Sequence, residues 1–363
     1  MRKVYPFLIF LISLACSKDP APSAPVPLFS IPKNFPQPDY PVAQKPVTEA
    51  GFALGKQLFY DGILSRDSTI ACGECHRQYY AFTHHMHDLS HGIENRTGLR
   101  NSLALQNLAW QKHYMWDGAV ENLDLQAIVP ITHPDEMDDT MENVVKKLQR
   151  TKGYPPLFKA AYGTEDITAD RTLHALTQFM LTLVSANSRY DKYVRKEGET
   201  LSADELEGMK LFESKGCKSC HAGELFTDGS FRNNGLPKFE RTKVVYVNGK
   251  PTLQVVVDEG RYTVTKQESD RFTFKVPSLR NIAESLPYTH DGRFTKLQEM
   301  LDHYASGVQD TPNLDPLLKQ NGRLGIPMTA DEKRKIIAFL NTLTDTEFLK
   351  DQRFAEPAGF PVR

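Results

Sequence analysis

The feature that most constrains this chain is a short motif that occurs twice. Residues 72–76 read Cys-Gly-Glu-Cys-His, and residues 217–221 read Cys-Lys-Ser-Cys-His. In such a run the two thiols can add across the vinyl groups of one haem, and the histidine then lies under the iron as its proximal ligand. The two runs therefore predict two covalently bound haem c groups. The residues that would hold them are Cys72, Cys75, Cys217 and Cys220 for the thioether bonds, and His76 and His221 for the irons.

A Cys-x-x-Cys pair also occurs in zinc half-sites, redox dithiols and disulfides. Those sites do not require a histidine directly after the second cysteine, whereas both copies here have one. The repeated histidine therefore favours haem attachment. Four of the five cysteines belong to the two motifs, and the fifth, Cys16, has a separate context.

The N-terminus has the order of an export signal. Two basic residues precede an apolar run over residues 4–12, which is too short to span a bilayer permanently. Ala15-Cys16 resembles a bacterial lipoprotein processing site, at which Cys16 would be lipidated. An ordinary signal peptide is the alternative, because Ser13 stands where such sites usually have leucine. We expect residues 1–15 to be a signal peptide and the protein to be exported, either periplasmic or attached to the outer membrane by a lipid anchor alone.

The composition is that of an ordinary soluble protein. Of 363 residues, 40% are hydrophobic and 25% are charged, and this length is sufficient for two domains with buried cores. The formal net charge of -1 leaves no basic excess, so a nucleic acid is not an expected partner.

Proline dominates the segment from residue 17 to residue 46, which excludes helices and central strands there. We expect residues 16–47 to be a lipoprotein anchor followed by a semi-rigid linker. Folded structure should begin near Thr48.

Two patterns recur at constant offsets and indicate an internal duplication. A Gly-Lys-Gln-Leu-Phe run at 55–59 precedes the first haem motif, and Gly-Met-Lys-Leu-Phe at 208–212 precedes the second. The second pattern consists of Tyr114, Asp117, Gly118 and Leu123, which recur as Tyr288, Asp291, Gly292 and Leu297.

Periodicity and capping signals predict mostly helices. Apolar residues keep helical spacing over 173–184, and the runs at 202–205 and 329–332 have the form of capping boxes. The second of these runs opens a predicted helix whose apolar positions continue to Leu343. Two β-branched runs around Asn248-Gly249 predict a small hairpin, although Pro251 weakens its second strand.

The predicted fold is mainly α, with two tandem cytochrome-c-like haem domains and a small β-hairpin insertion. The N-terminal domain would span residues 48–198 and the C-terminal domain residues 199–349. A tail at 350–363 would follow.

Several further runs are distinctive. They are Arg100-Asn-Ser102, Trp116-Asp-Gly118, Gln126, Glu136-Met137, Lys275-Val-Pro-Ser-Leu-Arg-Asn281 and His290-Asp-Gly-Arg-Phe294. Together with the tandem haem motifs, and in this order, they resemble the bacterial dihaem cytochrome c peroxidase family, including its MauG-like members. The resemblance covers about residues 48–349.

The resemblance implies a peroxidase that reduces hydrogen peroxide to water at the N-terminal haem. Electrons from a small donor protein, such as a cytochrome c or a cupredoxin, would be relayed through the C-terminal haem. Glu136 would take a proton from peroxide and return one to the departing oxygen. Gln126 would line the same pocket, and Trp116 would lie between the haems as a stepping stone for electrons. Without the resemblance, Trp116 would be interpreted as a core anchor and Glu136 as part of a solvated acidic turn.

The resemblance also implies one calcium ion between the domains. Its ligands would be Asn101 and the backbone carbonyls of Ser285 and Pro287, which are oxygen donors suited to this ion. Relatives are often dimers, so a homodimer is among the expected assemblies.

One departure from the family concerns the first haem. In members that need reductive activation a loop histidine caps this haem, and the matching position here is Ile93, which cannot bind iron. We therefore expect an iron that is open to peroxide. His91 lies two residues away in a cluster of four histidines, which could cap the haem from a shifted loop, bind a surface metal or form a solvated polar loop. The others are His84, His85 and His87.

A second departure concerns the other haem, whose sixth ligand in the peroxidases is usually a methionine that raises the reduction potential. Alignment through the neighbouring Pro-Tyr and His-Asp-Gly runs places Tyr304 there, as in MauG. A phenolate would stabilise oxidised iron and lower the potential. Met300, one helical turn earlier on the same face, is the alternative ligand, whereas His303 should point elsewhere.

Two other functions remain open. A MauG-like oxidase would use peroxide to oxidise a protein or small-molecule partner, and it would suit Ile93 and Tyr304. A non-enzymatic dihaem electron carrier would do best with both irons closed, which an open first site and Glu136 oppose.

Overall fold

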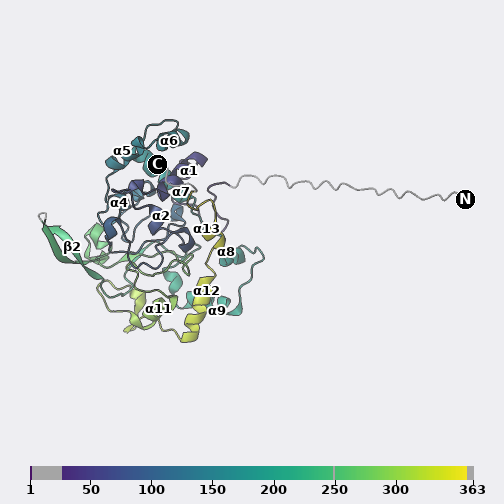
Figure 1. Ribbon diagram of the computed structural model, residues 1–363. Helices are drawn as coiled ribbons and strands as arrows, with labels where there is room; N and C mark the ends of the chain where they lie inside the picture. Colours follow the sequence, from purple (N-terminus) through teal and green to yellow (C-terminus); the bar gives the residue numbers. More distant parts are fainter. Residues whose placement is uncertain (2–26, 248–249, 358–363) are drawn as a thin grey trace.

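The computed structural model describes residues 27–247 and 250–357, together with Met1 (Figure 1). The fold is mainly helical, as predicted, with small two-stranded sheets. The helices are α1 (Glu49–Tyr60), α2 (Cys72–Cys75), α3 (Leu123–Gln126), α4 (Ile128–Thr132), α5 (Met141–Arg150), α6 (Tyr154–Tyr162), α7 (Ala169–Leu181), α8 (Arg189–Val194), α9 (Ala203–Ser214), α10 (Tyr262–Thr265), α11 (Leu297–Asp302), α12 (Ala330–Asn341) and α13 (Thr346–Lys350). The strands pair antiparallel as β1 (Phe231–Arg232) with β4 (Phe274–Lys275), β2 (Glu240–Val247) with β3 (Lys250–Val257), and β5 (Lys319–Gln320) with β6 (Arg323–Leu324).

The first half of the chain is built on the packing of α1 against α7. The hydroxyl of Thr48 accepts a hydrogen bond from the Gly51 amide and so caps the start of α1. Gly55 lies at the contact between the helices, where a Cβ atom would come within 1.9 Å of the Ala175 carbonyl oxygen. The two helices can approach this closely only because residue 55 has no side chain.

The second half repeats this arrangement with α9 and α12. Gly208 corresponds to Gly55, and a Cβ atom there would come within 1.9 Å of the Lys335 carbonyl oxygen. The predicted capping boxes at 202–205 and 329–332 are both present at the starts of these helices. The repeated glycine therefore marks the same helix contact in each half.

The second repeated pattern also has the same geometry in both halves. Tyr114 and Tyr288 each begin an isolated antiparallel bridge. Each hydroxyl donates a hydrogen bond to the carbonyl six residues earlier, Leu108 for Tyr114 and Ile282 for Tyr288. The internal duplication that the sequence predicts thus extends from helix packing to loop conformation.

Helices α7 and α12, which pack against α1 and α9, end earlier than the apolar pattern of the sequence predicts. Helix α7 ends at Leu181 and α12 ends at Asn341, whereas the apolar pattern continues to residue 184 and to Leu343. Leu183 and Leu343 are nonetheless fully buried. Beyond the end of each helix, the apolar residues in the sequence therefore mark buried side chains and not a continuation of the helix.

The proline-rich segment does not stay apart from the fold. Phe35 and Tyr40 are buried, and Phe35 packs edge-on against Trp110, with ring centroids 5.1 Å apart. The indole Nε1 of Trp110 donates a hydrogen bond to the Pro36 carbonyl at 2.8 Å. We call residues 28–47 the N-terminal strap. For this part, the prediction of a linker outside the fold is wrong, because aromatic side chains between the prolines find buried surface.

The C-terminal residues return to the first half of the chain. Phe348 and Leu349, in α13, belong to the hydrophobic core of that half, as does Phe354. The hydroxyl of Tyr60, in α1, donates to the Phe354 carbonyl at 2.6 Å. The prediction that the second domain ends at residue 349 and that a separate tail begins at residue 350 is therefore wrong. Helix α13 and the residues after it pack into the core of the first half.

The predicted hairpin is present as β2 and β3, which extend from the body of the molecule (Figure 1). Val244 pairs with Leu253 across it. Pro251 lies within β3 opposite Tyr246, so it does not end the strand. The turn at 248–249 lies outside the described residues.

The predicted signal peptide and Cys16 also lie outside the described residues, within 2–26. Among the helices that the structure does describe, none is long and apolar enough to cross a bilayer.

Candidate active site

The first Cys-x-x-Cys-His motif forms a single helical turn, α2, which ends at Cys75 and is followed directly by His76. The His76 amide donates to the Cys72 carbonyl at 2.9 Å, and the ring Nδ1 donates to the Phe82 carbonyl at 2.7 Å. The second hydrogen bond fixes the orientation of the ring and leaves Nε2 as the nitrogen available to a metal. Burial lowers the pKa of His76 to about 4, so the ring is neutral, as an iron ligand must be.

The second motif has the same design. The His221 amide donates to the Cys217 carbonyl at 3.0 Å, and its Nδ1 donates to the Phe226 carbonyl at 3.2 Å. Burial lowers the pKa of His221 as well. The thiols of both motifs are unpaired in the structure. Free thiols beside a neutral, oriented histidine in each half fit two c-type haems.

The first cavity has a volume of about 830 Å³ and is lined by His76. The three residues predicted to be catalytic, Trp116, Gln126 and Glu136, line the same cavity. Gln126 ends α3, and Glu136 lies in the turn that follows α4. Burial raises the pKa of the Glu136 carboxyl. The fold therefore brings together a candidate iron ligand, an amide, an indole and a carboxyl whose proton affinity is increased.

The loop that could cap this cavity is held by Glu136 itself. The amide of Ile93 donates to the Glu136 carbonyl at 2.8 Å, and Ile93 is fully buried. Gly92 lies equally close, since a Cβ atom there would be 2.3 Å from the same carbonyl oxygen. An apolar side chain therefore occupies the position where a capping histidine would be expected.

The four histidines of this loop stack with one another and with a tyrosine. The His84 and His87 rings are 4.1 Å apart and stacked, His91 meets His87 edge-on at 4.8 Å, and His85 stacks on Tyr80 at 3.8 Å. Among the described residues, the lining of the first cavity includes none of these histidines. Within the same part of the chain, no group of three or more His, Cys, Asp or Glu residues is arranged to hold a metal ion.

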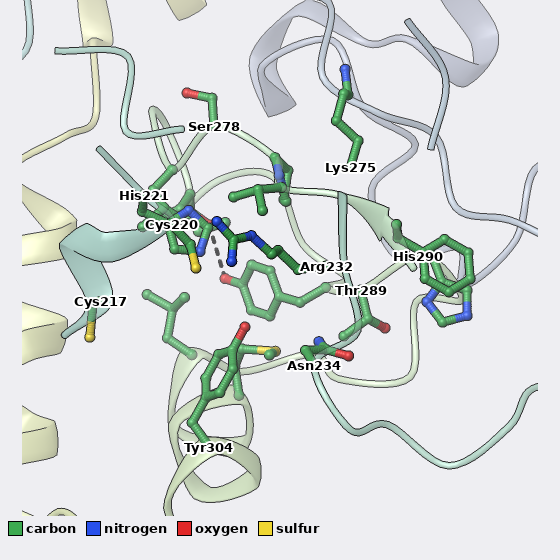
Figure 2. A pocket seen from close by; sticks show the side chains of 18 of the residues that line it. Cys217, Cys220, His221, Arg232, Asn234, Lys275, Ser278, Thr289, His290 and Tyr304 are labelled. Carbon is green, nitrogen blue, oxygen red and sulfur yellow. Dashed lines mark hydrogen bonds between the residues drawn. The ribbon is translucent and has the colours of Figure 1, made fainter. Parts of the chain in front are cut away.

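The second cavity has a volume of about 240 Å³, and its lining includes Cys217, Cys220 and His221 together with Met300 and Tyr304. Figure 2 shows the Tyr304 ring rising from its helix toward the part of the pocket that holds the cysteines and His221. Burial raises the pKa of the Tyr304 phenol to about 12. Both predicted candidates for the sixth ligand therefore reach the cavity.

Within the described part of the chain, His303 is not among the residues that line the second cavity. Its Nε2 donates to the Asn234 carbonyl at 3.0 Å. The π-helical turn His303–Gly307 follows α11 directly and carries Tyr304. Such turns are frequent at functional sites because they change the direction in which a side chain leaves a helix.

Trp116 lines both cavities. Its indole Nε1 donates to the Asn101 carbonyl at 2.9 Å, and its own carbonyl accepts from the Lys275 amide at 2.7 Å. The indole is thus held by the first half of the chain, and the backbone of Trp116 is held by the second half.

The residues of the predicted calcium site belong to the lining of one cavity. Asn101, Ser285 and Pro287 all line the second cavity. The side-chain nitrogen of Asn101 donates to the His87 and Asp88 carbonyls at 3.0 and 3.1 Å. The amide of Asn101 is therefore held by the loop that carries the histidines.

Two residues of the cavity walls, His133 and Lys275, had no predicted role. His133 lines the first cavity beside Glu136, and Lys275 lines both cavities. Lys275 is the first residue of the distinctive run at 275–281, and this position was the only feature of the sequence that pointed to a role for it. Its burial could not be read from that run, because lysines are mostly exposed.

Comparison with known proteins agrees with this geometry. Residues 49–199 match the family model described as di-haem cytochrome c peroxidase. The chain is 34% identical to the methylamine utilization protein MauG of Methylorubrum extorquens over 323 residues, which is 87% of this chain and 83% of that protein. It is also 34% identical to cytochrome c551 peroxidase of Nitrosomonas europaea over 293 residues, 80% of this chain and 79% of that one.

Solved structures give the same result. A crystal structure of a MauG-like protein associated with microbial copper homeostasis matches with a TM-score of 0.76 and 30% identity, over 90% of this chain and 98% of that one. The diheme peroxidase BthA of Burkholderia thailandensis shares the fold, with a TM-score of 0.70 at 22% identity over 86% of this chain and 90% of that one. By its sequence, its fold and its two motif sites, the chain belongs to the di-haem cytochrome c peroxidase family, among whose members are both peroxidases and MauG proteins.

Proposed function

We propose that this protein reduces hydrogen peroxide to water in the cavity lined by His76, and that electrons reach this cavity from the second one past Trp116. The observation that carries the proposal is that Glu136, Gln126 and Trp116 share one cavity with His76, while Trp116 also lines the cavity of His221. Membership of the family implies two c-type haems and an oxidoreductase of the peroxidase type.

The bound haems would supply the electrons and the iron at which the O–O bond breaks. Overall, one hydrogen peroxide, two electrons and two protons give two water molecules. The Glu136 carboxylate would take the proton from one peroxide oxygen and deliver it to the other, which leaves as water. Its raised pKa supports this role, because a group that both accepts and donates a proton works best with a pKa nearer the working pH.

Gln126 would orient the peroxide through its side-chain amide. Its Nε2 lies 3.6 Å from the Met115 sulfur, which is a weak acceptor. A stronger oxygen acceptor such as peroxide could replace this contact at little cost. Ile93, held on the Glu136 carbonyl, supports a first haem that is open to peroxide without prior reduction.

A second candidate function is favoured by Tyr304, which faces the second cavity. A phenolate ligand to the haem of His221 would lower its reduction potential, which suits storage of oxidising equivalents better than uptake of electrons. The protein would then use peroxide to oxidise a protein or small-molecule partner, as a MauG-like oxidase. A non-enzymatic electron carrier is less well supported, since it would have no use for the carboxyl of Glu136 at an open cavity.

The experiment that tests these proposals begins with low-temperature electron paramagnetic resonance of the oxidised protein, before and after one equivalent of peroxide. One high-spin and one low-spin ferric signal, both lost with peroxide, are expected. Two low-spin signals that do not respond to peroxide would mean that a histidine such as His91 caps the first haem. Rapid peroxide turnover with a reduced cytochrome c or cupredoxin would favour the peroxidase over the oxidase.

The remaining proposals concern assembly and location. We propose a lipid anchor on Cys16, export to the periplasm or outer membrane, one calcium ion at Asn101, Ser285 and Pro287, and a homodimer as one assembly. Labelling with a fatty-acid analogue tests the anchor, with Cys16→Ser as the control. Chelation followed by metal analysis tests the calcium ion, and light scattering tests the dimer.

A further inference from the structure

Lys275 is a buried cation at the wall that the two cavities share. It lies at the end of β4, its residue is 7% exposed, and it lines both cavities. No carboxylate within the described residues forms an ion pair with it, in contrast to the other lysine and arginine residues of the two cavity walls. Each of those, Arg100, Lys112, Arg232 and Arg261, has a carboxylate oxygen within 3.8 Å.

The ammonium group lies on the side of the first cavity. Its Nζ donates to the Gln111 side-chain oxygen at 2.6 Å and to the His113 carbonyl at 3.0 Å, and both of these residues line the first cavity. Figure 2 shows the side chain extending away from Tyr304 and His221. The backbone amide of Lys275 meanwhile donates to the Trp116 carbonyl at 2.7 Å, so this lysine is anchored to the segment that carries the indole.

Two neutral acceptors leave this cation without a compensating charge. Burial lowers the pKa of Lys275 to about 8, which reflects the cost of keeping an ammonium group out of water. Buried charges in proteins are normally paired, and an ammonium group has three donors, of which two are used here. The site therefore lacks one anionic acceptor on the cavity side.

A c-type haem carries carboxylate groups, its two propionates, and the first motif places one haem in this cavity. We propose that Lys275 is the counter-ion of a propionate of the haem bound at His76, and that its charge raises the reduction potential of that haem. The inference rests on haem binding by His76 but not on peroxide as the substrate. Lys275 is thus a positioning residue that acts through the haem.

The test is a spectroelectrochemical titration of the haem-loaded Lys275→Met variant. Loss of a desolvated positive charge near the haem should make reduction less favourable by about tenfold for the haem of His76, which is about 59 mV for one electron, and less for the haem of His221. Lys275→Arg should keep the potential. Lys112→Met removes a cation from an exposed part of the same wall and should leave both potentials unchanged, since water screens that charge.

The Gln111→Leu variant distinguishes the effect of the Lys275 charge from the effect of its hydrogen bonds to the first half of the chain. It removes one acceptor of the ammonium group but keeps the charge, so the potential should not fall. If Gln111→Leu lowers the potential as much as Lys275→Met does, or if neither variant changes it, Lys275 is only a tether between the two halves and the proposal is wrong.

A second measurement applies to the wild-type protein, so that a variant that fails to fold leaves the question decidable. A propionate that accepts a hydrogen bond from an ammonium group should show a resonance Raman bending mode that shifts in D₂O. The absence of a shift in the haem of His76 would overturn the proposal. Neither readout uses peroxide, so a protein that fails to turn over peroxide could still confirm the role of Lys275.

Discussion

Glu136 reaches the first cavity from a turn whose backbone is held by the loop at 92–93. The carbonyl of Glu136 accepts the Ile93 amide, and burial raises the pKa of its carboxyl. In the second cavity the two candidates for the sixth ligand, Tyr304 and Met300, both belong to the lining that also contains His221. At the scale of single residues, the proposed chemistry would therefore depend on a carboxyl in one cavity and on a sixth ligand in the other.

Replacing Glu136 with Gln should slow the reaction with peroxide by about 10² to 10⁴-fold, because the amide cannot accept and return the proton. Absorption spectra of the haems should stay unchanged. In the wild type the rate should fall as the pH drops through the raised pKa of Glu136, since only the carboxylate can accept the proton. Stopped-flow mixing with peroxide measures both effects.

Asp135→Asn is the matched control, because this neighbouring carboxylate pairs with Lys243 of the hairpin. It should react at nearly the wild-type rate. Equal losses in the two variants would mean that the negative charge of the turn matters rather than proton transfer by Glu136.

Replacing Tyr304 with Met should raise the reduction potential of the haem at His221 by more than about 59 mV, a factor of ten in its reduction constant. The reason is that a thioether favours reduced iron, whereas a phenolate favours oxidised iron. Met300→Leu should leave the potential unchanged if Tyr304 is the ligand. If a redox titration shows that Met300→Leu changes the potential and Tyr304→Met does not, Met300 is the sixth ligand of the iron.

At the scale of elements, the two halves are joined through α8 and the motif that contains Arg280. The guanidinium of Arg280 makes two hydrogen bonds of 2.8 Å to the Asp191 carboxylate, and both side chains are fully buried. The strap adds to this contact, since Asn34 donates to the same carboxylate and the Phe35 ring lies 4.6 Å from the guanidinium. A strap, a helix and a loop thus meet at one buried ion pair.

Replacing Arg280 with Met should lower the free energy of unfolding by about 3–5 kcal/mol, because Asp191 would be left charged and buried. The double variant Arg280→Met with Asp191→Leu should recover part of the loss. Urea unfolding measures both variants. A double variant as unstable as the single one would show that packing, rather than an unpaired charge, causes the loss.

The same pair gives a pH dependence. Burial alone would raise the pKa of Asp191, but the hydrogen bonds and charge of Arg280 outweigh burial and lower it. The stability from this carboxylate is therefore fully present above its unfolded pKa of about 3.9 and is lost as the pH falls through the lower folded value. Acid unfolding of the wild type and of the double variant should differ in this range.

At the scale of the whole molecule, the C-terminal residues pack against the first half of the chain. Helix α13 and the residues after it leave the second half and complete the core of the first, where Phe348 and Phe354 are 4% and 2% exposed. Gln78, shortly after the first haem motif, donates to the Phe348 and Asp351 carbonyls at 3.2 and 2.8 Å. The last part of the chain therefore supports the environment of the first haem.

Replacing Phe354 with Ala should lower the free energy of unfolding by about 3–5 kcal/mol, because it leaves a cavity in the first core. The absorption of the haem at His76 should change at a lower temperature than that of the haem at His221. Leu317→Ala, at a side chain that is 39% exposed, should change stability by less than about 0.5 kcal/mol. Simultaneous loss of both haem signals at the wild-type temperature would contradict this account.

The sequence by itself determined those features that depend on neighbours along the chain. The spacing within each Cys-x-x-Cys-His motif decides which atoms can meet one haem, and the capping boxes at 202–205 and 329–332 start helices through bonds three residues apart. Gly55 and Gly208 revealed the duplication because the same close helix contact excludes a side chain in both halves.

The tertiary structure decided what depends on segments far apart in the chain. The strap packs on Trp110, the C-terminal residues return to the first core, and the four histidines are not among the described residues that line the first cavity. Lys275 became a buried cation without a carboxylate partner among the described residues in the same way. Each of these outcomes is set by which surfaces exclude water when distant segments meet, and local propensity and spacing carry no information about that.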